Sequence, residues 1–200
     1  MKQFTKLFAA AIGVAGALAM GTSARGQLVL SSFPAGFTLN AYYANWSTAT
    51  HSDTGAGFMI TSAGYGSGYY ALPSTVDGSA YNAIQMTLDV AGPAGPPISS
   101  AIADLTDSSG DMEFFPLQYG LTAGNGQTYT MLISAGTMRS GASLDMAHLT
   151  DFNIEDDPGG YSGQYTVTYH NLSLVNVPEP TSLALFGLAG AGLLIFRRRK

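Results

Sequence analysis

Apolar and polar residues alternate one by one along the stretch Ile84–Val90. Residues 128–133 and 165–174 repeat this alternation, and Asn171 breaks its phase once. A period of two puts the apolar side chains of a strand on one face, whereas a helix would scatter them around its axis. The three stretches therefore predict half-buried β-strands, and the break at Asn171 predicts a β-bulge.

Shorter apolar runs fill the rest of the central region, and clusters of Gly, Pro, Asp, Asn and Ser separate them. Such clusters are typical of turns between short strands. No amphipathic helix of ten or more residues is evident between Gln27 and Val177, and only Ala142–Leu149 is compatible with a short one. The pattern predicts an all-β fold, an antiparallel β-sandwich. Its further strands are expected at residues 27–30, 36–42, 58–62, 68–72, 98–104, 114–117 and 149–154.

The N-terminus has the three parts of a secretory signal peptide. Lys2 and Lys6 form a positive start, Leu7–Met20 is apolar, and small residues follow. The apolar stretch is too short and wrongly flanked for a spanning helix. Cleavage after Ala24 or after Gly26 fits the small residues, and cleavage after Gly26 is preferred. We therefore expect residues 1–26 to be a signal peptide, helical in its apolar part.

The last 23 residues combine a proline-rich acidic motif, an apolar segment and a basic end. They contain Pro178, Glu179 and Pro180, then residues 181–196, then Arg197, Arg198, Arg199 and Lys200. The 16 residues of this segment would form a helix of about 24 Å, slightly shorter than the ~30 Å hydrocarbon core of a bilayer. Snorkelling of the basic side chains and local thinning can close this gap. We expect a transmembrane helix here, with the preceding residues outside the cytoplasm.

This arrangement resembles the PEP-CTERM sorting domain of Gram-negative bacteria. The resemblance rests on Pro178-Glu179-Pro180, on the small residues at 187–192 and on the three terminal arginines. It implies that an exosortase-like processing enzyme recognises the chain and cuts it near the motif, so that the membrane helix is transient. The alternative is an ordinary C-terminal membrane anchor, which has no need of Pro-Glu-Pro.

Removing both terminal segments leaves residues 27–177, the length of one ordinary domain. This stretch has one cation, Arg139, against twelve carboxylates, which is a formal charge of −11. Because such a surface repels phosphate and anionic lipid, no nucleic-acid partner is expected. The chain has no cysteine, which excludes disulfides and thiolate metal sites.

Two stretches of this domain resemble jelly rolls of the galactose-binding-like and carbohydrate-binding-module type. In residues 68–84 a strand leads through a polar loop into Tyr81-Asn82-Ala83-Ile84, and residues 165–174 end in Asn171-Leu172-Ser173-Leu174. The resemblance implies a jelly-roll sandwich. It supports the fold more than any particular ligand.

Catalytic motifs are absent from the sequence, which contains no Gly-x-Ser-x-Gly, P-loop, Gly-x-Gly-x-x-Gly or His-Glu-x-x-His. The three histidines lie far apart along the chain. Glu113, beside two phenylalanines, is the best candidate for a raised pKa and could be the acid of a small secreted glycan-active enzyme. A glutamate at a strand edge next to core aromatics is the commoner role, so we predict no catalytic residue.

Two acidic clusters offer the oxygen ligands that calcium prefers. The first extends from Asp104 to Glu113. The second extends from Asp151 to Asp157, contains Glu155, Asp156 and Asp157, and is followed by Pro158 and two glycines. Neither has the spacing of an EF-hand, and solvated turns of an acidic protein would have the same composition. Of the two, we favour calcium at the second cluster.

Aromatic residues are the remaining candidates for ligand binding. Tyr42, Tyr43 and Trp46 lie together, and Tyr69 and Tyr70 lie in a Gly-rich stretch. Sugar rings stack on exposed aromatic planes, while Asn, Asp and Gln bind their hydroxyls. These five residues are therefore predicted to contact a ligand, although a sandwich core also buries Tyr and Trp.

The sequence as a whole predicts an exported protein of the cell envelope, outer surface or extracellular space. Its non-catalytic sandwich is expected to bind or organise extracellular polysaccharide. The alternatives are the small glycan-active enzyme and a purely structural protein of the surface or matrix.

Overall fold

The computed structural model describes residues 26–34, 37, 40–41, 50–53, 57–62, 65–92, 99–157, 163 and 165–178. Gln27–Val175 forms one compact unit. The expected signal peptide up to residue 25, the apolar segment 181–196, and Glu179, Pro180 and the terminal arginines lie outside the described residues. In the part that is described, no helix is long and apolar enough to cross a membrane. The division of the chain after residues 26 and 177 stays a prediction.

Strands account for most of the described chain, joined by turns and two short 3-10 turns. The strands are β1 (Leu28–Ser31), β2 (Asn40–Ala41), β3 (Thr50–Asp53), β4 (Phe58–Ser62), β5 (Gly66–Val76), β6 (Ala83–Ala91), β7 (Ser99–Asp107), β8 (Met112–Leu121), β9 (Gly124–Leu132), β10 (Thr137–Ser140), β11 (Leu149–Asp156) and β12 (Tyr165–Val175). The 3-10 turns are η2 (Ile133–Ala135) and η3 (Met146–His148).

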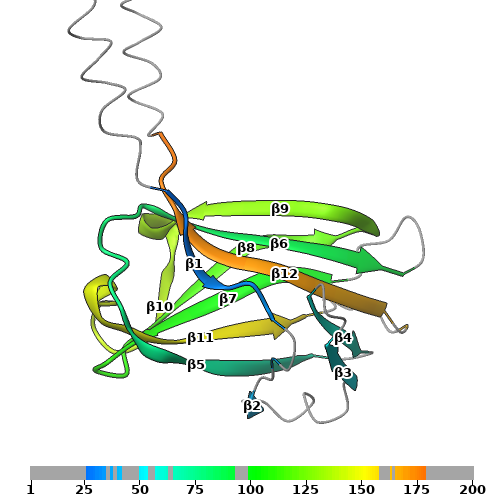
Figure 1. The fold of residues 1–200 in the computed structure, drawn as a ribbon, viewed down its shortest axis with the longest axis horizontal. Helices are drawn as coiled ribbons and strands as arrows, with labels where there is room; N and C mark the ends of the chain where they lie inside the picture. Colours follow the sequence, from blue (N-terminus) through cyan, green and yellow to red (C-terminus); the bar gives the residue numbers. More distant parts are fainter. Residues whose placement is uncertain are drawn as a thin grey trace, which may run out of the picture. The chain divides into compact units, whose positions relative to one another are not determined.

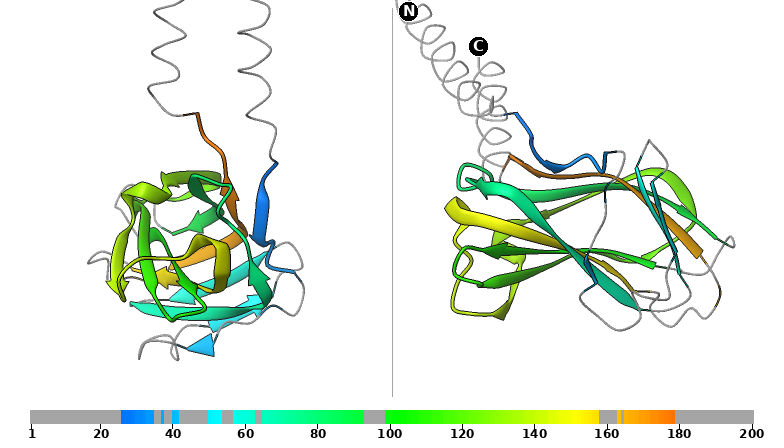
Figure 2. Two further views of the ribbon diagram at one scale, coloured as in Figure 1. Left: turned by 90° about the vertical axis from the view of Figure 1, so that its left-hand side faces the viewer. Right: turned by 60° about the horizontal axis from the view of Figure 1, so that its bottom comes forward.

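The strands form two sheets that face each other (Figure 1 and Figure 2). In sheet A the order is β3-β4-β12-β6-β9, and β1 also pairs with β12. In sheet B the order is β10-β8-β7-β11-β5-β2. Every strand pair between described residues is antiparallel. The structure therefore confirms the predicted all-β antiparallel sandwich.

β12 is a central strand of sheet A and carries the predicted break of phase. Its register with β6 shifts between Tyr169 and Asn171, which makes His170 the additional residue. Both Tyr169 and Leu172 are buried in the core, although they are three residues apart. The bulge expected at Asn171 is confirmed, and its extra residue is what returns the apolar side chains to the core face.

The core between the sheets contains a cluster of aromatic rings around Phe152 of β11. The Phe152 ring stacks on Phe37 with centroids 6.4 Å apart, meets Phe33 edge-on at 6.2 Å and lies 5.4 Å from Tyr70 of β5. With one cation in the whole domain, burial of apolar surface is the main term that stabilises this fold. The other largest fully buried side chains are Tyr165, Tyr169, Phe58, Phe115, Ile60, Ile84, Met86 and Leu88.

Four segments differ from the sequence-based expectation or match it only in part. The strand expected at 36–42 is described only as the two residues of β2, and the helix-compatible patch at 142–149 contains only the turn η3. β3 and β10 have no counterpart among the predicted strands. Each has four residues, and each lies at an edge where it pairs with β4 or β8. An alternation this short is not recognisable in a sequence, so tertiary pairing decides such strands.

Candidate functional site

The outer face of sheet B carries polar side chains that strand alternation turns away from the core. The apolar residues of β7 and β11 point into the core, so Asp104, Asn153 and Glu155, which alternate with them, point outward. The register places Asn153 beside Asp104 on one side and beside Tyr69 of β5 on the other. Glu155 lies opposite Ser67 of β5. These five residues therefore share one face of sheet B across three strands, and all of them except Tyr69 are buried.

Arg139 of β10 reaches over this surface and binds both of its carboxylates. Its Nη1 and Nη2 donate to Oε1 and Oε2 of Glu155, the second over 2.9 Å. Its Nε lies 3.2 Å from Oδ1 of Asp104, and Nδ2 of Asn153 donates to the other oxygen of Asp104 over 3.4 Å. The guanidinium carbon lies 4.4 Å from the centre of the Phe114 ring. This arrangement holds the guanidinium plane by a bidentate ion pair and a cation–π contact.

A bulge in β10 positions Arg139. The register with β8 shifts between Met138 and Ser140, and such a bulge re-aims the side chain of the extra residue. The Arg139 side chain is 29% exposed, whereas those of Asp104 and Glu155 are 0% and 2% exposed. A ligand in solution can therefore reach the guanidinium, while the two carboxylates beneath it act as its support.

Burial shifts the proton equilibria of this cluster. Burial, together with the charge of Glu155, raises the pKa of Asp104 to about 7. Burial favours the neutral form of Arg139, but its hydrogen bonds to Glu155 and the charge of Asp104 outweigh this and raise its pKa. Burial and the charge of Glu155 also raise the pKa of Tyr65, just before β5, to about 12. Near neutral pH, Asp104 therefore exchanges between a protonated and a charged form while Arg139 stays charged.

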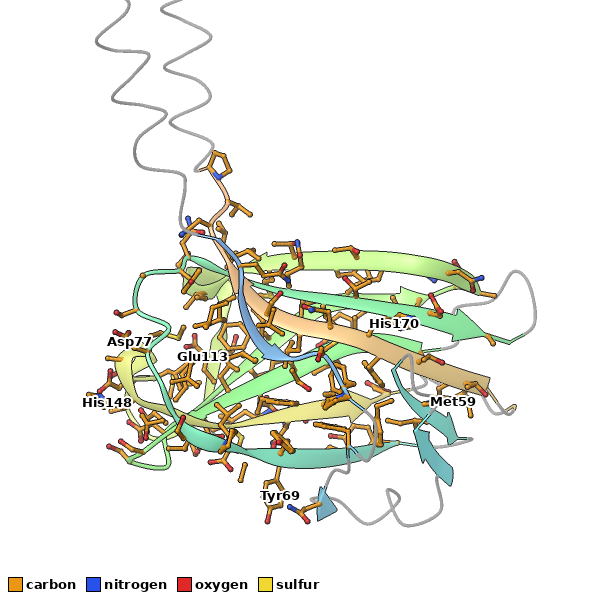
Figure 3. All side chains as sticks on the ribbon, viewed as in Figure 1. Met59, Tyr69, Asp77, Glu113, His148 and His170 are labelled. Carbon is orange, nitrogen blue, oxygen red and sulfur yellow. The ribbon has the colours of Figure 1, made fainter. Side chains whose placement is uncertain are left out.

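The predicted acid Glu113 lies on β8 (Figure 3). Burial raises its pKa, in the direction that the sequence suggested. The sequence named Asp104 only as a possible calcium ligand and did not predict its raised pKa, because desolvation depends on which strands cover a residue and not on its neighbours in the chain. One signal was available: Arg139 is the domain's lone cation among twelve carboxylates, and a buried carboxylate needs such a partner.

The five predicted ligand-binding aromatics are only partly described. Tyr69 and Tyr70 are consecutive residues of β5 and point to opposite faces. Tyr69 is partly exposed and points away from sheet A (Figure 3), whereas Tyr70 packs on aromatic rings of the core. Tyr42, Tyr43 and Trp46 lie outside the described residues. Of these two tyrosines, only Tyr69 therefore lies on the outer face of sheet B, and its role in ligand binding stays a prediction.

The predicted calcium ligands Glu155, Asp156 and Asp157 lie at the end of β11 and just after it. Both carboxylate oxygens of Glu155 already accept hydrogen bonds from Arg139. Across the described ranges, no group of three or more His, Asp or Glu residues is arranged to hold a metal ion. Calcium binding by the second acidic cluster stays a prediction, centred on Asp156 and Asp157.

Millimolar calcium is expected to raise the midpoint of thermal unfolding, because a cation that binds only the folded chain stabilises it by mass action. Changing Asp156 and Asp157 together to Asn should remove most of the rise, and magnesium at the same ionic strength is the control for screening. Equal midpoints in calcium and in chelator would show that neither cluster binds calcium.

Known proteins resemble this chain at its C-terminus and in its fold. Residues 176–200 match the family described as the PEP-CTERM protein-sorting motif. The chain ends in a PEP-CTERM sorting motif. This sorting motif indicates an exported protein that an exosortase-type system sorts to the cell envelope. Among curated proteins, no sequence matches the chain.

Ahead of the sorting motif, the sandwich is similar to solved carbohydrate-binding modules and to part of an agarase. The family 11 carbohydrate-binding module from Clostridium thermocellum, in complex with a β-1,3-1,4-mixed-linked tetrasaccharide, is 19% identical with a TM-score of 0.51, over 78% of this chain and 99% of the module. The solution structure of CtCBM11 is 18% identical with a TM-score of 0.51, over 78% of this chain and 99% of that one. The agarase AgWH50C is 12% identical with a TM-score of 0.52, over 77% of this chain and 25% of the agarase. These likenesses confirm the predicted resemblance to a carbohydrate-binding-module sandwich.

Proposed function

We propose that this exported protein binds or organises extracellular polysaccharide without catalysing a reaction on it. The observation that carries the proposal is the outer face of sheet B, where Tyr69 and Arg139 lie over a support of buried polar residues. The fold likeness adds support, because carbohydrate-binding modules are among the similar solved structures. Tyr42, Tyr43 and Trp46 remain predicted ligand contacts.

Tyr69 and Arg139 supply complementary contacts to a sugar. The partly exposed Tyr69 ring offers a plane for the C–H face of a pyranose. A guanidinium has five N–H donors; Glu155 takes two, and a third points toward Asp104. Tyr65 also shares a hydrogen bond with the Arg139 side chain, so at most one N–H donor of Arg139 remains for a hydroxyl or ring oxygen of a sugar. Because Glu155 and Phe114 already hold the guanidinium, it loses little further freedom when a ligand binds.

The charges favour a neutral, hydroxyl-rich polysaccharide. Arg139 is the only cation of residues 27–177, and two carboxylates balance it. An anionic polysaccharide would meet a domain with a formal charge of −11 and no unbalanced cation at this face. A neutral glycan avoids that repulsion and uses the hydrogen-bond donor that remains.

The geometry argues against Asp104 and Glu155 as the acid and base of a glycan-active enzyme. A general acid must approach the glycosidic oxygen to within hydrogen-bond reach. Both carboxylates are almost fully buried, and both are bound to Arg139. They are better suited to positioning the guanidinium than to proton transfer with a sugar.

Protein expressed from the full-length chain is expected to be retained on one or more neutral polysaccharides without releasing reducing sugar. Tyr69→Ala should weaken retention by about 1–3 kcal/mol, because a stacked ring is lost, and Trp46→Ala should do so if that residue also stacks. Affinity electrophoresis measures the change. Tyr119→Ala is the matched control, since Tyr119 of β8 is 56% exposed and lies outside the proposed contacts.

Two results of this experiment would contradict the proposal. Failure to bind any neutral glycan, with the fold intact, would leave a purely structural surface or matrix protein. Sugar release that disappears in Glu113→Gln would instead identify a glycan-active enzyme.

We further propose that residues 1–26 and the C-terminal tail are removed, the latter by a cut near Pro178-Glu179-Pro180, so that membrane anchoring through residues 181–196 is transient. Support comes from the charged and apolar pattern of both termini and from the sorting motif. The intact mass of protein recovered from the envelope or the medium is expected to lack both ends. A main species that still ends in Arg199-Lys200 would be evidence for a permanent anchor.

A further inference from the structure

A second tyrosine, Tyr65, lies on the outer face of sheet B just before β5 begins. Residues 65, 67 and 69 are spaced by two, so their side chains share one face of the extended chain. Tyr69 points outward (Figure 3), and Ser67 lies opposite the outward-facing Glu155. The Tyr65 hydroxyl shares hydrogen bonds with Glu155 and Arg139. Both the spacing and these contacts therefore place Tyr65 on the outer face.

The strand register sets Tyr69, Arg139 and Tyr65 in a row along β5. In the pairing of β5 with β11, Glu155 lies opposite Ser67, midway between residues 65 and 69. Arg139 donates two hydrogen bonds to Glu155, which hold its guanidinium near the level of that midpoint, one strand across. At a rise of ~3.3 Å per residue, the two tyrosines lie about 13 Å apart along the strand.

The Tyr65 side chain is held in place before any ligand arrives. Because arginine can only donate and a carboxylate can only accept, its hydroxyl accepts a hydrogen bond from Arg139 and donates one to Glu155. The hydroxyl is thus committed to the protein, and the ring is the part that a ligand can contact. Tyr65 is partly exposed, as Tyr69 is. A fixed, partly exposed ring can stack on a sugar with little loss of side-chain freedom.

We propose that Tyr65 is a second stacking residue and that the ligand is an extended oligosaccharide chain of more than two sugar units, lying along β5 from Tyr69 to Tyr65. This inference rests on the proposed function of the same face. One sugar ring is much shorter than the row, so it contacts only one of the two tyrosines. An extended chain contacts both, and its second contact forms at high effective concentration once the first has formed. Arg139 then contacts a unit between the two ends.

The dependence of affinity on chain length tests this arrangement. The probes are oligomers of one to six sugar units, prepared from the neutral polysaccharide that best retains the full-chain protein. Calorimetry is expected to show that affinity rises with added units until the chain covers both tyrosines and stays constant beyond that length. An affinity that is already constant from one or two units onward would overturn this inference and leave the proposed function intact. A protein that binds no glycan would overturn both.

Two substitutions of Tyr65 separate the role of its ring from that of its hydroxyl. Tyr65→Ala is expected to weaken binding of the six-unit oligomer at least about fivefold, the lower limit for loss of a stacked ring. Tyr65→Phe should retain most of the affinity, because it keeps the ring and removes only the hydroxyl. An unchanged circular dichroism spectrum shows that each variant folds.

Tyr119→Ala is the matched control, since Tyr119 is exposed but lies on β8, away from the row. It is expected to bind the six-unit oligomer as the unmodified protein does. Unchanged binding by Tyr65→Ala would overturn the second stacking contact. Equal losses in Tyr65→Phe and Tyr65→Ala would overturn it too, because Tyr65 would then act only by positioning Arg139.

Discussion

Replacing Arg139 with alanine is expected to lower the free energy of unfolding by about 3–5 kcal/mol, the usual cost of removing one partner of a buried ion pair. Asp104 and Glu155 would stay buried without their cation, and Phe114 would lose the guanidinium above its ring. Chemical denaturation with urea measures the change at neutral pH.

Two further variants separate the charge effect from lost packing. Arg139→Lys keeps the charge but cannot form the bidentate pair, so its loss should be intermediate. Combining Arg139→Ala with Asp104→Asn and Glu155→Gln should recover most of the stability, because no charge is then left buried. If Arg139→Ala costs less than about 1 kcal/mol, as exposed pairs do, the cluster does not support the outer face of sheet B.

The stability of the protein is expected to fall as the pH rises from about 5 to 8. Asp104 has a pKa of about 7 in the folded chain against 3.8 as its ordinary value. At a pH between these two pKa values, the folded state binds more protons than the unfolded state. Protonation of Asp104 therefore stabilises the folded state fully below the unfolded pKa of 3.8, and this stabilisation is lost as the pH rises through the folded pKa of about 7. One such proton gives a slope of at most about 1.4 kcal/mol per pH unit.

Urea midpoints at pH 5, 6, 7 and 8 measure this slope. Asp104→Asn removes the titrating group and should flatten the profile between pH 5 and 8. Asp111→Asn, in the turn between β7 and β8, is the comparison variant and should keep the slope. A stability that is constant or rises over this range in the unmodified protein would mean that Asp104 is charged throughout.

The ion-pair cluster also determines how glycan binding should be interpreted. Asp104 and Glu155 act on a ligand only through Arg139, so Asp104→Asn is expected to change stability more than retention on a polysaccharide. Tyr69→Ala should do the reverse, because Tyr69 points outward and its ring is not part of the core. The two variants thus separate the support of the outer face from its contacts.

The sequence by itself determined the features whose signal lies in a contiguous run of residues. Long alternations at 84–90, 128–133 and 165–174 identified three adjacent strands of sheet A, and one break of phase located the bulge beside Asn171. The sorting motif is likewise a contiguous pattern of charge and hydrophobicity. Such features can be recognised because neighbouring residues alone carry the signal.

Only the tertiary structure decided which strands adjoin and what their side chains meet. Asp104, Arg139 and Glu155 come from three strands of sheet B, and no local pattern assigns Arg139 to those two carboxylates. Tyr69 and Tyr70 are adjacent and alike in sequence, yet the register of β5 sends one outward and the other into the core. The physical reason is that strand order, register and burial arise from contacts between distant segments, and these contacts set both desolvation and exposure.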